Sequence, residues 1–226
     1  MTEPSGANAG GFGSSPEGAT EEGAADVTDH YYTRRPTAGH DRKTVRAVLR
    51  GMPFAFVTDA GVFSKGGVDF GTRLLIETVE LPEDARVLDM GCGWGAIGIA
   101  LSRLVPKGAV TMADVNERAL ELARENARLN GAAGVEIVAS DLFDGLAGRT
   151  FTHIVTNPPI RAGKETVYRL FAQAAAHLEP GGELWLVIRR QQGAPSARRQ
   201  LESLFAEVRE AAKDKGYFVF CAVRHG

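Results

Sequence analysis

The stretch that decides the fold is Val87-Leu88-Asp89-Met90-Gly91-Cys92-Gly93-Trp94-Gly95, which runs into a helical pattern over residues 96–104. A short apolar run that ends in closely spaced glycines and continues into a helix is typical of the first turn of a βαβ unit. Glycine permits the tight turn and lets a bound molecule approach the peptide groups closely. This stretch therefore predicts an α/β fold with a ligand site at the end of the strand.

The same alternation of short apolar runs and amphipathic segments continues after this stretch, as it does in parallel α/β proteins. The segment 117–130 is the clearest helix, because its small and apolar residues share one face and Gly131 is placed to end it. On its outer face we expect the ion pairs Glu121/Arg124 and Glu125/Arg128. The predicted strands cover residues 86–90, 109–114, 135–140, 153–157 and 183–188, and the predicted helices cover residues 96–104, 117–130, 164–178 and 197–205.

A β-hairpin is predicted on each side of this core. The N-terminal one turns at Arg50-Gly51 and is followed by a helix through residues 74–79, and the C-terminal one turns through residues 214–216. The expected hairpin strands are residues 44–50 with 53–59, and residues 208–213 with 217–224. The sequence thus predicts an α/β fold with a mostly parallel seven-stranded sheet, a C-terminal antiparallel hairpin and a small N-terminal β-hairpin extension.

Composition limits the class of protein. The chain has 226 residues and 44% of them are hydrophobic, which is enough for a packed core. No run reaches the roughly 18 apolar residues of a membrane span, and the N-terminus lacks the basic and apolar segments of a signal peptide. Cys92 and Cys221 are far apart and the histidines have no ligand spacing, so we expect neither a disulfide framework nor a metal site. These features favour a cytoplasmic protein with no membrane partner.

Charge is distributed unevenly. Residues 1–29 hold six acidic residues, no Lys or Arg, and too few large apolar side chains to offset the entropy of ordering. We therefore expect a disordered acidic tail over residues 1–29 and one folded domain over residues 30–226. The rest of the chain has 26 basic against 22 acidic residues, with a concentration of bases in residues 34–50. This balance suits a polyanionic partner, and a solvated basic surface is the simpler alternative.

Two cofactor classes compete for the glycine-rich loop. Residues 91–96 fit G-x-G-x-x-A, the fingerprint of a nicotinamide dinucleotide site, and Asp114 is placed for a ribose. However, Asp89 stands two residues before the first glycine, where a carboxylate repels a pyrophosphate and suits an ammonium group. S-Adenosyl-L-methionine carries an amino-acid end, a ribose and an adenine but no phosphate, so Asp89, Asp114 and Asp141 can meet its parts in turn. These three spaced carboxylates favour S-adenosyl-L-methionine.

A second motif, Asn157-Pro158-Pro159-Ile160, follows the fourth core strand, at the edge where open α/β sheets bind ligands. An amine on an aromatic ring is a poor nucleophile because its lone pair is delocalised. If the Asn157 side-chain oxygen accepts one amine hydrogen and the Pro158 carbonyl accepts the other, the lone pair is directed toward a methyl donor. The motif predicts methyl transfer to an exocyclic amine, with Asn157, Pro158 and Pro159 as catalytic residues.

Together these motifs carry a family resemblance. The chain also contains Val62-Phe63-Ser64, then Asp69-x-Gly71, and later Gly193-Ala194-Pro195-Ser196. Over about residues 30–226 it resembles class I S-adenosylmethionine-dependent methyltransferases of the small-subunit (16S) ribosomal RNA guanine-N2 type, in their short single-domain form. The resemblance implies a Rossmann-like class I fold, with a hairpin and cofactor-covering segment over residues 30–70 and a catalytic core over residues 71–226.

The resemblance also implies roles for single residues. Phe63 and Ser64 are expected to cover the cofactor, Asn157 to hold the target amine, and Ile160 and Arg161 to contact the substrate. The residues expected to contact the cofactor are Asp89, Gly91, Gly93, Gly95, Asp114, Asn116, Asp141 and Asn157. Many relatives have an aromatic residue after N-P-P that stacks on the base. Since this chain has Ile160 there, stacking must come from elsewhere or the substrate differs.

Our leading hypothesis is methylation of guanine N2 in ribosomal RNA, free or in the small-subunit particle. Tyr31, Tyr32, Arg34 and Arg35 are expected to contact this RNA through rings and charges. Because N-P-P recognises a planar amine or amide, a protein glutamine side chain and a small-molecule amine are alternative acceptors. A non-catalytic RNA-binding module and a nicotinamide oxidoreductase are the hypotheses from other classes. The sequence leaves the oligomeric state open.

Overall fold

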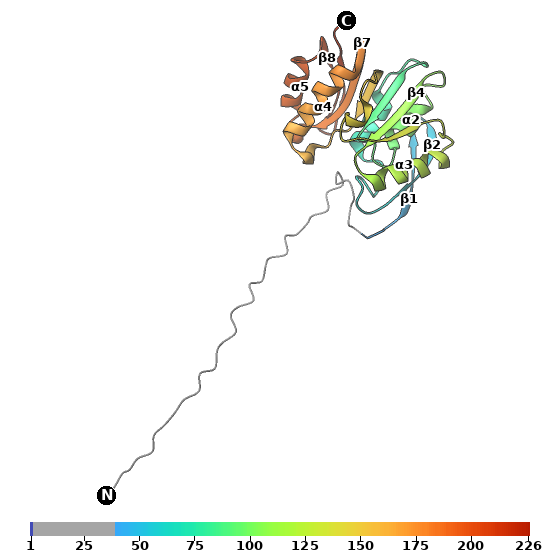
Figure 1. Ribbon diagram of the computed structural model, residues 1–226, viewed down its shortest axis with the longest axis vertical. Helices are drawn as coiled ribbons and strands as arrows, with labels where there is room; N and C mark the ends of the chain where they lie inside the picture. The colour runs from blue at the N-terminus through green and yellow to red at the C-terminus, as the bar shows by residue number, and fades with distance from the viewer. Residues whose placement is uncertain (2–38) are drawn as a thin grey trace.

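The computed structural model describes Met1 and residues 39–226 of the chain (Figure 1). The rest of the expected acidic tail over residues 1–29 lies outside the described residues. The same is true of the expected RNA contacts Tyr31, Tyr32, Arg34 and Arg35. These expectations stay predictions. Among the described helices, none has both the length and the hydropathy to cross a membrane.

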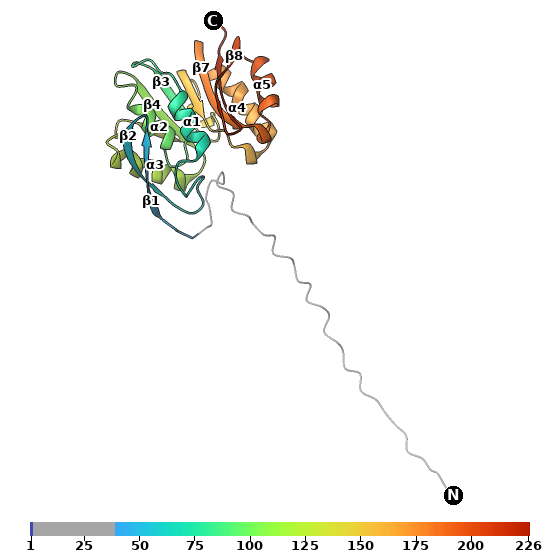
Figure 2. The same cartoon turned by 180° about the vertical axis from the view of Figure 1, so that it is seen from behind.

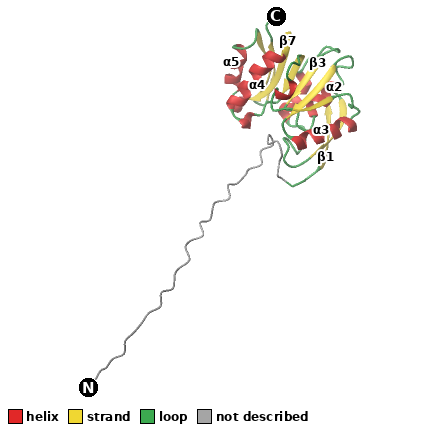
Figure 3. Cartoon of the chain, viewed as in Figure 1, coloured by secondary structure: helices red, strands yellow, loops and turns green. Residues whose placement is uncertain are grey.

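A seven-stranded sheet runs through the molecule in the order β5-β4-β3-β6-β7-β9-β8 (Figure 3). β3 to β7 pair in parallel, whereas β9 is antiparallel to both of its neighbours. The strands are β3 (Arg86–Met90), β4 (Ala109–Asp114), β5 (Glu136–Ala139), β6 (Phe151–Thr156), β7 (Leu178–Arg189), β8 (Glu207–Asp214) and β9 (Tyr217–Val223). The predicted mostly parallel sheet with a C-terminal antiparallel hairpin is confirmed. All carboxyl ends of β3 to β6 meet at one edge, which is where polar side chains gather.

Helices cover both faces of the sheet and enclose two hydrophobic clusters. Apolar residues of α1 (Phe70–Thr78), α2 (Ala96–Ser102) and α3 (Glu117–Leu129) pack with Trp185 in one cluster. Apolar residues of α4 (Lys164–His177) and α5 (Ala194–Glu202) pack with Phe220 in the other. Figures 1 and 2 show α4 and α5 beside β7 and β8, and α3 beside the N-terminal hairpin. Three short 3-10 helices are η1 (Asp144–Leu146), η2 (Ile160–Ala162) and η3 (Arg190–Gln192).

The predicted N-terminal hairpin is a separate two-stranded sheet of β1 (Lys43–Leu49) and β2 (Met52–Thr58), which turns at Arg50-Gly51. Two asparagines of the α3 end hold it. Asn126 accepts a hydrogen bond from the Val57 amide at 2.6 Å and donates to the Val57 carbonyl at 2.9 Å. Asn130 makes the same pair of bonds with Ala55, at 3.1 and 2.8 Å. The side-chain amides thus satisfy backbone groups along the free edge of β2.

Some element boundaries differ from the sequence-based prediction. β7 begins at Leu178 rather than at residue 183, because Leu178 already pairs with Phe151 ahead of a bulge. The last helix begins at Ala194 rather than at residue 197, because Gly193 takes the left-handed conformation (φ 97°) at its N-cap and a proline occupies its first turn. On α3, Glu125 pairs with Arg42 beside the hairpin instead of with Arg128. Long-range contacts decide this ion pair, and helix periodicity cannot show them.

Candidate active site

The glycine-rich loop turns back on the sheet directly after β3. The amides of Gly91 and Cys92 both donate to the Ala113 carbonyl, at 2.8 and 3.0 Å, which ties the loop to β4. Gly91 and Gly93 have φ values of 72° and 56°, a region that L side chains rarely adopt. A Cβ at either position would meet nothing within 4 Å, because both residues line a cavity. The loop therefore presents bare backbone to any molecule bound there.

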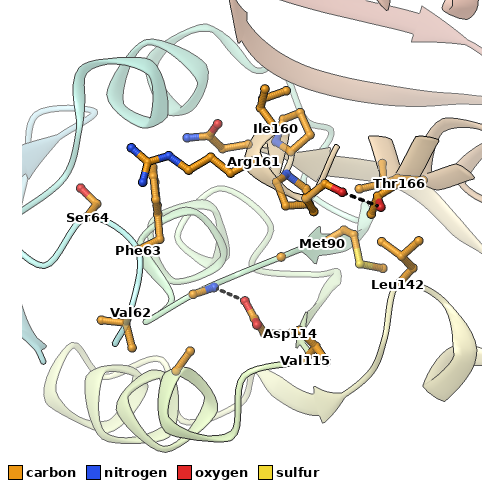
Figure 4. Close-up of a pocket in the computed structure, with 18 of the residues that line it drawn as sticks. Val62, Phe63, Ser64, Met90, Asp114, Val115, Leu142, Ile160, Arg161 and Thr166 are labelled. Atoms are coloured by element: carbon orange, nitrogen blue, oxygen red, sulfur yellow. Dashed lines mark hydrogen bonds between the residues drawn. The ribbon is translucent and has the colours of Figure 1, made fainter. Parts of the chain in front are cut away.

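Asp114 ends β4 beside this loop and lines the same cavity. Its Oδ2 accepts a hydrogen bond from the Gly93 amide and its Oδ1 accepts one from the Asn116 amide, both at 2.8 Å (Figure 4). Burial raises the pKa of this carboxyl, and the backbone hydrogen bonds oppose the rise. Each oxygen keeps a lone pair, so the carboxylate can accept hydrogen bonds from two neighbouring hydroxyl groups of a ligand.

Asp89 lies one layer deeper. It is fully buried on β3, where its Oδ2 accepts a hydrogen bond from the Gly98 amide at 2.8 Å. Its Oδ1 has no hydrogen-bond partner among the described residues. Burial raises its pKa to about 7, the Gly98 hydrogen bond opposes this rise, and repulsion from Asp114 adds to it. Asp89 does not line the cavity, so it supports the loop from behind.

The cavity has a volume of about 760 Å³ and opens at the carboxyl edge of the sheet. It brings together most of the residues that the sequence singled out, and Figure 4 shows them converging from separate elements. The predicted residues that line it are Phe63, Ser64, Gly91, Gly93, Asp114, Asp141, Asn157, Pro158, Pro159, Ile160 and Arg161. Asp89, Gly95 and Asn116 lie outside the lining, and their contacts with a cofactor stay predictions.

Asn116 and Gly95 have structural partners instead. The buried Asn116 caps α3 by accepting a hydrogen bond from the Ala119 amide at 3.1 Å. Its Nδ2 donates to the Gly61 carbonyl at 3.0 Å, which holds the segment that precedes Phe63. A Cβ on Gly95 would come within 2.9 Å of the Ile99 side chain. Both residues therefore shape the surroundings of the cavity.

The covering segment over residues 62–66 lies against the loop rather than free in solvent. The Trp94 indole donates to the Phe63 carbonyl at 2.9 Å, and the Thr58 hydroxyl donates to the Lys65 carbonyl at 2.7 Å. Ser64 takes a positive φ of 56° within this turn. Phe63 keeps 38% of its surface exposed while it lines the cavity.

Asn157 is held from one side by α1. Its Nδ2 donates a hydrogen bond to the Thr72 hydroxyl oxygen at 2.9 Å, which leaves Oδ1 as the acceptor of this side chain. Thr72 lies in the first turn of α1, where its amide donates to the N-cap Asp69 at 3.1 Å. A Cβ on Gly71 would lie 2.8 Å from the Tyr217 ring, so only glycine permits this close packing of α1 on β9.

Sequence reasoning missed Thr72, although it directly follows the quoted Asp69-x-Gly71. It also missed Thr166, Arg169 and Gln192, which line the cavity from α4 and η3. Asp141 faces one of them, because its Oδ1 lies 3.8 Å from the Arg169 guanidinium. Gln192 lies just beyond the carboxyl end of β7, whereas Thr166 and Arg169 lie inside α4 and have no such sequence signal.

The prolines set the direction of the chain after Asn157. The Pro158 carbonyl accepts a hydrogen bond from the Ile160 amide at 2.8 Å and keeps one lone pair. The Thr156 hydroxyl donates to the Met90 carbonyl at 2.8 Å, which fixes the end of β6 against the end of β3. Asn157 therefore lines the cavity at a fixed position relative to Met90 and the glycine-rich loop.

S-Adenosylmethionine fits the groups present. The volume falls within the roughly 300–1,000 Å³ of small-molecule sites. Bare backbone at Gly91 and Gly93 leaves space for a ligand, and the carboxylates of Asp114 and Asp141 offer hydrogen-bond acceptors. Among residues 39–226, no three His, Cys, Asp or Glu side chains gather as a metal site requires.

Comparisons with known proteins agree with this geometry. Residues 53–221 match the family model described as "Methyltransferase small domain". An uncharacterized Bacillus subtilis protein, YbxB, is 48% identical over 87% of this chain and 98% of its own length. The ribosomal RNA small subunit methyltransferase C of Haemophilus influenzae is 38% identical over 70% of this chain and 49% of that protein. The chain thus spans about half the length of that ribosomal RNA methyltransferase.

A solved structure is also similar. The T. thermophilus 16S rRNA N2 methyltransferase, determined in complex with AdoMet and guanosine, superposes with a TM-score of 0.72. It is 26% identical, and the match covers 84% of this chain and 52% of that protein. The nicotinamide alternative is therefore wrong, as is the alternative of a non-catalytic module. The chain belongs to the methyltransferase small domain family and is a class I enzyme that uses S-adenosylmethionine.

Proposed function

We propose that the protein methylates the exocyclic N2 amine of a guanine in small-subunit ribosomal RNA. The observation that carries the proposal is the orientation of Asn157, whose Nδ2 is engaged by Thr72 at 2.9 Å while its Oδ1 is left to accept a hydrogen bond at the cavity. The names of the similar ribosomal RNA methyltransferases support an RNA substrate. The match covers about half of the length of each of these proteins.

The chain's part in the reaction is to orient the target amine. S-Adenosylmethionine supplies an electrophilic methyl group when it is bound. Asn157 Oδ1 accepts one hydrogen of the amine, and the free lone pair of the Pro158 carbonyl accepts the other. These two acceptors hold the amine in the plane that directs its lone pair into the cavity, and the proton that the nitrogen loses passes to water. Orientation of this kind is worth about 7 to 11 kcal/mol when it is complete.

The remaining assignments follow the same geometry. Asp114 is proposed to accept the ribose hydroxyls and Asp141 the adenine amine, with Ser64 and Phe63 covering the cofactor. Asp89 lies behind the loop, and above its pKa of about 7 the ionised carboxylate favours an ammonium group beside the loop through its field. Ile160 and Arg161 are proposed to contact the substrate base, since both line the cavity next to Asn157.

The test is Asn157→Ala, measured by single-turnover methyl transfer at saturating cofactor. The acceptors are protein-free 16S rRNA, small-subunit particles, total protein and a small-molecule extract. We expect transfer to RNA to fall by about a hundredfold or more, because each tenfold in rate is about 1.36 kcal/mol and alignment is lost together with a hydrogen bond. Cofactor affinity should change less than about twofold, because the ribose contacts are assigned to another strand end.

Gln200→Ala is the matched control, because it removes an amide of α5 that does not line the cavity. It should transfer methyl groups as the wild type does. If Asn157→Ala keeps wild-type turnover, the N-P-P segment is only a turn and the mechanism is wrong. If the wild type methylates protein or a small amine and not RNA, the chemistry stands and the substrate assignment is overturned.

A further inference from the structure

Four cations gather beside the mouth of the cavity on elements to which the proposed chemistry assigns no role. Arg189 ends β7 and Arg190 begins η3, while Lys213 lies near the end of β8 and Lys215 lies in the β8–β9 turn. The Arg190 amide donates to the Gly216 carbonyl at 2.8 Å, which joins the two segments. We call these four residues the basic corner. All four side chains are exposed.

The basic corner differs from other parts of the surface in its charge balance. Elsewhere in residues 39–226 many cations are neutralised, as in the ion pairs Lys107–Glu83, Arg149–Glu136 and Arg198–Glu202. None of the four cations of the basic corner forms an ion pair with a carboxylate of the described residues. A single carboxylate, Asp214, lies within the turn. This corner therefore carries unneutralised positive charge that suits a polyanion.

Aromatic rings lie between these cations. The Arg189 guanidinium lies 5.4 Å from the centre of the Tyr217 ring, and the Lys215 ammonium lies 4.6 Å from the centre of the Phe70 ring. The two rings are 5.4 Å apart at 49° to each other. Both are half-buried, so part of each ring faces solvent. Cations alternating with flat apolar faces match single-stranded nucleic acid, which alternates phosphates with bases.

The basic corner is joined to the catalytic position through short contacts. Tyr217 packs on Gly71, and the next residue, Thr72, accepts the hydrogen bond from Asn157 at 2.9 Å. On the other side, Gln192 follows Arg190 in η3 and lines the cavity. An RNA strand that delivers a base to Asn157 would therefore pass over the basic corner.

From this placement we propose that the basic corner, with Phe70 and Tyr217, binds the single-stranded RNA that flanks the target nucleotide. The proposal rests on the proposed function, because it takes the acceptor at Asn157 to be part of an RNA chain. It supplies the stacking faces that Ile160, in place of an aromatic residue after N-P-P, does not. It also assigns phosphate contacts to residues of the catalytic domain itself.

The test compares RNA binding by variants of the full chain in which two basic residues at a time are replaced by glutamine. One variant carries Arg189→Gln with Arg190→Gln, and another carries Lys213→Gln with Lys215→Gln. The matched control removes the same charge from Lys107 and Arg128, which are exposed at the amino-terminal side of β4 and at the end of α3. The probe is a fluorescein-labelled, mixed-sequence single-stranded RNA, titrated over a range of salt concentrations.

Each basic-corner pair should weaken RNA binding at least about fivefold and lower the slope of log K against log salt by about 1.4, whereas the control pair should change neither. Phe70→Leu, which keeps apolar bulk without an aromatic face, should weaken binding by about fivefold at an unchanged slope. Cofactor affinity and melting temperature should stay as in the wild type for all pairs. Wild-type RNA affinity and slope in both basic-corner pairs would overturn the proposal. So would weaker binding to polyglutamate with unchanged binding to RNA.

Methyl transfer separates this proposal from the one on which it rests. If the wild type transfers no methyl group to 16S rRNA or small-subunit particles, the proposed function fails whatever the variants bind. If it does transfer, and both basic-corner pairs keep the wild-type KM for RNA, the proposed function stands and the basic corner is not the docking surface. A raised KM with an unchanged single-turnover rate at saturating RNA supports both.

Discussion

The buried carboxyl of Asp89 should make the stability of this protein fall as the pH rises toward neutrality. Its side chain is fully buried, and one of its oxygens has no hydrogen-bond partner among the described residues. Burial raises the pKa in the folded protein to about 7 from an ordinary value of 3.8, against the hydrogen bond from Gly98 and with the repulsion of Asp114. Between these two values the folded protein holds a proton that the unfolded chain has released.

The sign follows from proton linkage. The stabilisation is complete below about pH 4, where both states are protonated, and it is lost as the pH rises through about 7. The shift of the pKa of Asp89 corresponds to a free energy on the order of 4 kcal/mol. That is a large share of the roughly 5–15 kcal/mol by which a domain is stable.

The assay is urea unfolding of the cofactor-free protein and of Asp89→Asn, at steps from pH 5 to 8. Asparagine keeps an oxygen for the Gly98 amide and cannot ionise, so the wild type should lose stability relative to the variant as the pH rises. If the new amide changes the free energy of unfolding by the same amount at every pH, that change does not affect the trend with pH. Asp144→Asn, which replaces an exposed carboxylate, is the control for the substitution itself. If the difference between wild type and Asp89→Asn stays constant within about 0.5 kcal/mol, Asp89 is charged in the native state and the reasoning fails.

Three further outcomes are expected. Thr72→Val should lower single-turnover methyl transfer about two- to tenfold, since a neutral hydrogen bond is worth about 0.5–1.5 kcal/mol, while Thr72→Ser should restore it; equal rates in both variants would show that Thr72 does not position Asn157. Asp114→Ala should weaken cofactor binding in calorimetry by roughly ten- to a hundredfold, and unchanged affinity in a folded variant would refute its ribose contact. Asn126→Ala should lower the free energy of unfolding by about 2–4 kcal/mol in urea, because it leaves half-buried backbone groups of Val57 without this partner; a change below about 0.5 kcal/mol would show that the hairpin is held without Asn126.

The sequence predicted the parts of the site whose residues lie close to one another along the chain. A strand, a turn and a helix that follow one another fix where a glycine-rich loop lies, and the end of the next strand fixes Asp114. The N-P-P segment was located in the same way, as the end of another predicted strand. The structure places that strand, β6, beside β3 in the sheet. Such positions follow from the rule that carboxyl ends of parallel strands share an edge.

The parts that the sequence did not predict depend on contacts between distant segments. Thr72 and Asn157 are 85 residues apart, and Asn126 and Val57 are 69 apart, and no periodicity relates them. The depth of Asp89 is a different case. Val87 and Asp89 alternate with Leu88 and Met90 along β3, so Asp89 must share the face of Val87, which packs with α2. Strand alternation already placed its side chain under the helix rather than in the loop.

With the assignments proposed above, the cavity has a cofactor half and a substrate half. Three side chains hold the covering segment and the two residues before it. Arg118 donates to the Ala60 carbonyl at 2.9 Å, Asn116 donates to the Gly61 carbonyl, and the Trp94 indole donates to the Phe63 carbonyl. All three side chains come from the loop and α3, on the cofactor side. The substrate side is bounded by η2 and by Gln192 of η3, which follow β6 and β7 in the chain. Because the two halves are built on different strands of the sheet, substitutions that change cofactor affinity should differ from those that change RNA affinity. The two halves meet at Asn157, which lines the cavity and donates a hydrogen bond to Thr72 of α1, so a change there should affect the rate without either affinity.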